Sequence, residues 1–119
     1  MSDTETPLKP AEKPTANTAP FVIRTDNDGA DGVTTLSLNR PDELNALSEG
    51  MLATLQLELD DIADDRSVRV VVLEGAGRAF CAGHNLKQMR ANYSLAYQQE
   101  LFATCSKMMQ SVLRLPQPV

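Results

Sequence analysis

The stretch "VRVVVLEGAGRAFCAGHNL", residues 68–86, decides the fold because it joins a run of branched apolar residues directly to a glycine-rich loop. An almost continuous apolar run is typical of a strand that is covered on both faces. We therefore expect a buried strand over residues 68–74. The loop at 75–86 carries the question of function, since it brings glycines, a cysteine and a histidine together.

Two further strands are predicted upstream of this run. The segments "FVIRT" (21–25) and "VTTLSLN" (33–39) flank residues 26–32, which are rich in Asp, Asn and Gly and therefore typical of a turn. Together the three segments predict a β-hairpin. Pro41 then ends the second strand, because proline cannot donate a hydrogen bond to a neighbouring strand.

A helix is expected between the hairpin and the buried strand, over residues 48–65. Ser48 has the side chain of an N-cap, and apolar residues follow it at helical spacing: Leu52, Leu55, Leu59 and Ile62. The acids of this helix are expected mostly on its solvent face: Glu58, Asp60, Asp61, Asp64 and Asp65. The order of strand, helix and buried strand predicts a right-handed crossover with parallel pairing, and hence an α/β fold.

A second helix is predicted over residues 93–114. Apolar residues repeat there at helical spacing: Leu95, Phe102, Cys105, Met109 and Val112. We expect the methionines and aromatic residues of this helix to fill the core and not to hold a cofactor. The segment "LPQPV" (115–119) stops the helix, and Val119 is expected to begin another apolar strand.

Composition excludes several classes of partner. The net charge of −5 argues against a nucleic-acid partner, because such proteins need clustered positive charge. No apolar run approaches the length of a membrane span, so no membrane partner is expected. Residues 1–20 hold almost no apolar side chains and are expected to form a disordered leader, which leaves 21–119 for one domain. The leader lacks the features of a secretory or mitochondrial signal, which predicts a cytoplasmic protein.

Several side-chain chemistries can be weighed for the glycine-rich loop. A dinucleotide-binding loop needs a third glycine at the position of Phe80. Cys81 and His84 supply only two metal ligands, whereas zinc needs at least three, so no metal is expected. A small packing residue is the favoured interpretation of Cys81, ahead of a nucleophile with His84 as its base. Asp42 and Glu43 stand in no apolar context that would tune a carboxylate for acid–base catalysis.

The main chain of the loop offers a further chemistry. A strand that ends in glycines and continues through "FCAGHNL" (80–86) presents free amide N–H groups at its carboxyl end, and such donors can hold a developing oxyanion. Small residues such as Ala82 and Gly83 let a ligand approach the main chain closely. The alternative is a tight loop whose glycines serve only the turn, and these residues alone leave both interpretations open.

Three segments of the chain, taken in order, carry a resemblance. They are "LNRPDELNALS" (38–48), "VRVVVLEGAGRAFCAGHNLKQM" (68–89) and "LPQPV" (115–119). In this order and spacing they resemble the enoyl-CoA hydratase/isomerase, or crotonase, superfamily. The motifs "GHNLKQM" and "CSKMMQ" are most similar to its subgroup of enoyl-CoA hydratase domain-containing proteins. The resemblance implies a crotonase-like spiral of ββα repeats, of which residues 21–119 would form an incomplete, amino-terminal part.

The resemblance also implies a site for acyl-CoA, with coenzyme A as part of the substrate and no separate cofactor. The backbone N–H of His84 would be one of two donors that polarise the thioester carbonyl and stabilise an enolate. The side chain of His84 would then be incidental. The residues implied to line the coenzyme A site are Arg40, Leu44, Ala46, Ala82, Gly83, His84, Asn85, Leu86 and Lys87.

The implied activity is hydration or isomerisation of an acyl-CoA thioester, and family members commonly form trimers or hexamers. Asn85 stands where the family usually has Asp. The second oxyanion donor and the two catalytic glutamates of the hydratases lie, in the family, beyond the equivalent of Val119. The alternative is therefore a non-catalytic or truncated member that binds acyl-CoA without turnover.

Overall fold

The computed structural model describes residues 18–119. Of the leader predicted for residues 1–20, positions 1–17 therefore lie outside the described residues. Strands β1 (Val22–Asp26) and β2 (Val33–Leu38) form an antiparallel hairpin, and β3 (Val70–Gly75) pairs with β2 in parallel. The order in the sheet is β1-β2-β3. The predicted hairpin, the parallel pairing and the α/β class are confirmed.

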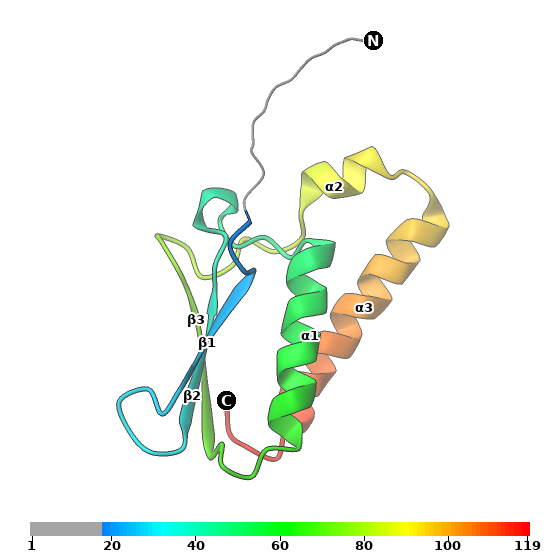
Figure 1. Cartoon of the computed structure of the whole chain (residues 1–119). Helices are drawn as coiled ribbons and strands as arrows, with labels where there is room; N and C mark the ends of the chain where they lie inside the picture. Colours follow the sequence, from blue (N-terminus) through cyan, green and yellow to red (C-terminus); the bar gives the residue numbers. More distant parts are fainter. Residues whose placement is uncertain (1–17) are drawn as a thin grey trace, which may run out of the picture.

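Three α-helices accompany the sheet in the described part of the chain: α1 (Glu49–Ala63), α2 (Leu86–Ala91) and α3 (Leu95–Arg114). Helices α1 and α3 lie side by side on one side of the sheet, and α2 lies across their upper end in Figure 1. The Ser48 side chain accepts a hydrogen bond from the N–H of Met51 at 3.2 Å, which confirms the predicted N-cap. The helix predicted over residues 93–114 corresponds to α3, whereas the short helix α2 lies outside the predicted range.

The core lies between α1 and the face of the sheet that it covers. Leu52, Leu55, Leu59 and Ile62 are all buried, as their helical spacing predicts. They pack in one cluster with side chains from the strands and from α3, including Leu36, Val71 and Cys105. Burial of this kind contributes about 1.5–3 kcal/mol for each large aliphatic side chain, so it fixes where α1 sits.

The prediction that the third strand is covered on both faces is wrong for this chain. Val71 is only 1% exposed, whereas its neighbours Val70 and Val72 are 39% and 40% exposed. The reason is geometric, because successive side chains of a strand point to opposite faces and both long helices lie on the same face (Figure 1). The other face of β3 has no helix over it among residues 18–119.

The predicted inward face of the last helix is also wrong in part. Leu101, Cys105 and Met108 are the residues of α3 that are buried. Of the residues expected inside, Leu95, Phe102 and Met109 are 71%, 47% and 52% exposed. The apolar residues of α3 extend around more than one face of the helix. The face that packs against α1 is the one with Leu101, Cys105 and Met108, so these residues are buried.

The segment after α3 returns to the sheet. The N–H of Val71 donates to the carbonyl of Pro118 at 2.9 Å, so the chain lies beside β3 where a further strand was expected, although no strand is assigned within residues 115–119. The side chain of Gln117 is buried and donates to the carbonyls of Ile62 and Asp65 at 2.8 and 3.2 Å. Gln117 thus adds a side-chain donor to carbonyls at and just beyond the C-terminal end of α1, which also accept the backbone N–H groups of Asp65 and Val68.

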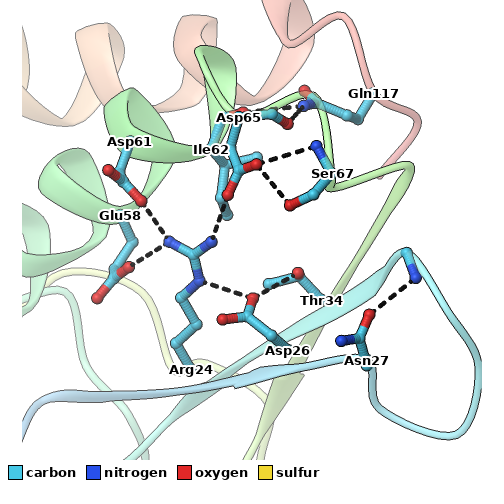
Figure 2. A network of polar contacts seen from close by, with 11 residues as sticks. Arg24, Asp26, Asn27, Thr34, Glu58, Asp61, Ile62, Asp65, Ser67 and Gln117 are labelled. Carbon is cyan, nitrogen blue, oxygen red and sulfur yellow. Dashed lines mark hydrogen bonds and ion pairs between the residues drawn. The ribbon is translucent and has the colours of Figure 1, made fainter.

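An ion-pair network joins β1 to the second half of α1 (Figure 2). The Arg24 guanidinium donates to Asp61 at 2.6 Å and to Asp26 at 3.0 Å, and it lies 3.4 and 3.5 Å from carboxylate oxygens of Glu58 and Asp65. Burial alone would lower the pKa of Arg24, but the carboxylates of Asp61, Asp26 and Glu58 raise it above its ordinary value. The acids predicted on the solvent face therefore hold a shared arginine, a pairing that the helical pattern does not reveal.

Candidate functional site

The segment before α1 and the loop after β3 are joined through their backbones. The N–H of Ala82 donates to the carbonyl of Leu44 at 3.0 Å, and the N–H of Leu47 donates to the carbonyl of Gly83 at 2.7 Å. Leu47 and His84 form an isolated parallel bridge. We call this pairing of residues 44–47 with residues 82–84 the loop bridge. It brings together two of the motifs that the sequence analysis singled out.

Asn45 fixes the loop bridge from inside. Its side chain is fully buried, and its amide donates to the carbonyls of Ala76 and Ala79 at 3.0 and 2.9 Å. Its amide oxygen accepts the N–H of Arg40 at 2.7 Å. Asn45 has a left-handed φ of 53°, a conformation that Asn adopts more readily than most residues. Asn45 lies in the motif "LNRPDELNALS" (38–48), but no local pattern indicates that its side chain is buried and joins two loops.

Two glycines shape the loop for different reasons. A Cβ on Gly75 would lie 2.7 Å from the Cα of Phe80, so the end of β3 and the loop approach too closely for any side chain. Gly83 has a φ of +90°, which L-residues rarely adopt, and no heavy atom lies within 4 Å of where its Cβ would stand. The main chain at Gly83 is therefore open on that side, immediately before His84.

His84 presents both its backbone and its ring at the loop bridge. Its N–H donates to no backbone carbonyl of residues 18–119. Its imidazole meets the ring of Phe102 edge to face, with ring centroids 4.7 Å apart and planes at 77°. The Nδ1 atom of His84 is buried and has no hydrogen-bond partner within the described residues. The side chain, expected to be incidental, thus makes a specific contact with α3, and no local sequence pattern indicates this contact.

Arg40 is placed beside the loop bridge, but its charge faces the segment before β1. Its guanidinium donates to the carbonyls of Ala19 and Pro20 at 2.7 and 3.0 Å and stacks over the ring of Phe21 at 3.9 Å. Arg40 is only 5% exposed. Residues 19 and 20, which were expected to belong to the leader, are therefore held to the domain, and the role of Arg40 toward coenzyme A stays a prediction.

The remaining predicted site residues lie on either side of the loop bridge. Ala46 is buried, and Ala82 is exposed. Asn85 caps α2, since its side chain accepts the N–H of Gln88 at 2.9 Å. Leu86 and Lys87 are exposed in the first turn of α2. Leu44, partly buried, completes the set of predicted residues that the fold places on or next to the loop bridge.

An apolar cavity of about 390 Å³ opens beside the loop. Phe80 and Cys81 of the loop form one wall, and side chains of the strands and of α3, including Leu73, Met108 and Leu113, form the others. Cys81 is a free, partly buried thiol. The cavity is suited to an apolar group whose polar end reaches the loop.

A polar cluster missed by the sequence analysis holds the N-terminal ends of the helices together. The Tyr97 hydroxyl of α3 donates to the carboxylate of Glu49, and this bond raises the pKa of Tyr97 to about 12. The N–H of Glu49 donates to the side-chain oxygen of Gln88 at 3.0 Å. These contacts tie α1, α2 and α3 to one another next to the loop bridge.

Across residues 18–119, no three His, Cys, Asp or Glu side chains gather closely enough to hold a metal ion. Within those residues, no helix combines the length and apolar character that crossing a membrane requires.

Comparison with known proteins gives consistent relatives. The family model described as enoyl-CoA hydratase/isomerase matches residues 33–119. Enoyl-CoA hydratase domain-containing protein 3, mitochondrial, is 41% identical in Xenopus laevis and 36% identical in Homo sapiens, over about three quarters of this chain. The alignments cover 30% and 29% of those relatives, so the chain spans about a third of their length.

Solved structures agree with the sequence relatives. An enoyl-CoA hydratase from Mycobacterium smegmatis is 50% identical and superposes with a TM-score of 0.81, covering 85% of this chain and 38% of its own. Human enoyl coenzyme A hydratase domain-containing protein 3 is 31% identical with a TM-score of 0.75, covering 83% of this chain and 38% of its own. The fold is thus part of the crotonase fold, and the chain belongs to the enoyl-CoA hydratase/isomerase family.

Proposed function

We propose that this chain binds acyl-CoA thioesters and polarises the thioester carbonyl through the backbone N–H of His84. The observation that carries the proposal is the loop bridge, where an N–H without a backbone acceptor in residues 18–119 follows the open main chain of Gly83. A fixed donor aimed at a developing oxyanion stabilises it without reorganisation during the reaction. The apolar cavity beside the loop accommodates the acyl group.

Coenzyme A would lie along the loop bridge and the start of α2. The residues proposed to line it are Arg40, Leu44, Ala46, Ala82, Gly83, Asn85, Leu86 and Lys87. Exposed Lys87 can attract the phosphates, although a single surface charge contributes little to affinity. No metal or separate cofactor takes part in this proposal.

The reaction proposed for the complete polypeptide is hydration or isomerisation next to the thioester. Both activities appear in the names of relatives, such as the 1,2-epoxyphenylacetyl-CoA isomerase of Escherichia coli, 47% identical over 55 residues. We further propose a cytoplasmic protein that assembles as a trimer or hexamer. Subcellular fractionation and size-exclusion chromatography with light scattering test these two points.

A non-catalytic acyl-CoA-binding protein is the second candidate. The observation in its favour is that no Asp or Glu is buried among residues 18–119. General acid–base catalysis by a carboxylate usually depends on a pKa tuned by burial. In this second proposal, residues 18–119 would provide acyl-CoA binding and one backbone donor, without a buried carboxylate for acid–base catalysis.

The test replaces the His84 amide with an ester, so that the N–H is lost while the side chain stays. With crotonyl-CoA as substrate, we expect the rate to fall on the order of a hundredfold, as for other oxyanion donors. The same replacement at Gly83 is the matched control and should have a much smaller effect. An unchanged rate in the His84 ester contradicts the proposed donor. Calorimetric binding of acyl-CoA without turnover in the unmodified protein selects the second candidate.

A further inference from the structure

We propose that Cys81 and Cys105 are a redox-active pair of thiols, in which a peroxide forms a disulfide that ties the loop after β3 to α3. They are the two cysteines of residues 1–119, and both are free thiols in the structure. The inference does not rest on acyl-CoA binding, because it concerns the chemistry of the thiols themselves. It assigns a site of covalent modification to the molecule.

The first observation is the packing around the two thiols. Cys105 is 4% exposed and belongs to the buried cluster of the core, and Cys81 packs against that same cluster. Cys81 also lines the apolar cavity together with Met108, which is buried on the same helix as Cys105. The two cysteines therefore border the same part of the core, one from the loop and the other from α3.

The second observation is where the loop lies along α3. His84, three residues after Cys81, contacts the ring of Phe102 with ring centroids 4.7 Å apart. At its other end, Cys81 shares the cavity wall with Met108. Phe102, Cys105 and Met108 follow one another at three-residue spacing, so they are neighbours about 4.5 Å apart along the helix axis. The loop thus meets α3 on either side of Cys105.

The third observation is a difference between the two thiols. Burial raises the pKa of the Cys105 thiol, and the proximity of Cys81 raises it further. A buried thiol with a raised pKa holds little thiolate and reacts slowly with a peroxide from solution. Cys81 is only partly buried and borders the open cavity of about 390 Å³, so a small peroxide can reach its sulfur. Cys81 is therefore the thiol that reacts first, and Cys105 is the thiol that resolves the product.

The reaction balances with hydrogen peroxide as the oxidant. The thiolate of Cys81 attacks one peroxide oxygen and becomes a sulfenic acid, the O–O bond breaks, and the other oxygen leaves as hydroxide, which takes up a proton to give water. The sulfur of Cys105 then attacks the sulfur of Cys81, and the S–O bond breaks. The hydroxyl group leaves with the thiol proton of Cys105 as a second water. Two thiols lose two electrons, and one peroxide is reduced to two waters.

Peptide mapping of the complete, folded polypeptide tests the proposal. After a short treatment with hydrogen peroxide, the remaining thiols are alkylated and the protein is digested without a reductant. Trypsin cleaves on both sides of each cysteine, after Arg78, Lys87, Arg90 and Lys107. Cys81 and Cys105 then lie in different peptides, 79–87 and 91–107. We expect these peptides to be joined, at the sum of their reduced masses less two hydrogen atoms, and to separate after treatment with dithiothreitol.

Two variants test the order of the steps. Cys105→Ala removes the resolving thiol, so Cys81 should be oxidised further to a sulfinic or sulfonic acid. Cys81→Ala is the matched control and should leave Cys105 reduced, because the core covers it. In the unsubstituted protein, unlinked peptides would overturn the inference, whether Cys81 is unmodified or carries a sulfinic or sulfonic acid. A link from either cysteine to a different cysteine of the complete polypeptide would overturn it as well, and none of these outcomes bears on acyl-CoA binding.

Discussion

The loop bridge and the Arg24 network lie at opposite ends of α1 and hold the fold in different ways. At the N-terminal end, neutral groups of the backbone and of Asn45 are buried and bonded at 2.7–3.0 Å. Toward the other end, Arg24 meets four carboxylates, of which those of Asp26 and Asp61 are 57% and 68% exposed (Figure 2). Water can replace the exposed carboxylates as partners of Arg24, but it cannot replace the buried partners in the loop bridge. The bonds of the loop bridge and of Asn45 join only neutral groups, so we expect them to be insensitive to salt and pH.

The largest expected effect comes from Asn45→Ala. The substitution removes two donated hydrogen bonds and one accepted bond in a fully buried position. At around 1 kcal/mol for each bond, we expect the free energy of unfolding to fall by about 3 kcal/mol. Urea unfolding followed by circular dichroism measures the change.

Asn39→Ala is the matched control for this substitution. The Asn39 side chain donates to the carbonyl of Pro20 at 3.1 Å in an exposed position, where water can take over the bond. We expect its effect to stay within about 0.5 kcal/mol, as for most surface substitutions. Equal losses in the two variants would remove the distinction between the buried bridge and the surface.

An intermediate effect is expected from Arg24→Met, which keeps an unbranched stem and removes the charge. Exposed ion pairs contribute little, but a shared arginine with several partners should contribute about 1 kcal/mol to the free energy of unfolding. Salt screens exposed charges, so the loss should shrink between low salt and 1 M salt. The loss in Asn45→Ala should not change with salt, and Arg66→Met, at an exposed arginine, is the control for a change of net charge.

The smallest effect is expected from Asp26→Asn and depends on pH. The Thr34 hydroxyl at 2.8 Å, followed by Arg24, holds the pKa of Asp26 below its ordinary value of 3.8. A carboxyl group whose pKa is lower in the folded than in the unfolded protein stabilises the fold at pH values above its unfolded-state pKa. This contribution is lost as the pH falls through the folded-state pKa. The variant should therefore be less stable than the parent near neutral pH.

The difference between Asp26→Asn and the parent should narrow as the pH drops below about 4. Urea midpoints measured at several acidic pH values follow this change. The effect of Asn45→Ala, which involves no titrating side chain, should stay constant over the same range as long as both proteins fold. A difference for Asp26→Asn that persists unchanged in acid would contradict the assigned pKa direction.

The sequence predicted those parts of the fold that depend on local pattern. The hairpin follows from turn residues between two apolar runs, and α1 follows from Ser48 and the spacing of its leucines. The burial of β3 and α3 could not be predicted in the same way. Val70 and Phe102 are as apolar as Val71 and Cys105, so their composition does not tell which of them are exposed. The exposed residues differ from the buried ones only because both long helices lie on one face of the sheet.

The candidate site could be predicted as a set of segments but not as a geometry. The motifs around Leu44 and Gly83 were recognised, yet nothing local reveals that they pair with each other. Two contacts at the site join residues that are far apart in the sequence. They are the ring contact of His84 with Phe102 and the hydrogen bond from Arg40 to the carbonyl of Ala19. Such contacts depend on how α3 and the N-terminal segment pack, and no periodicity encodes that packing.

The bonds made by Asn45 have a consequence for the order of folding. They connect residues 31 and 34 positions apart, and they span α1 and the whole of β3. The hairpin of β1 and β2 closes over a short turn, so it can form early, whereas contacts between distant residues form slowly because a long loop must close first. We therefore expect the loop that contains His84 to reach its final shape after β3 has paired with β2. The geometry of the proposed site should then be among the last features that the folding chain acquires.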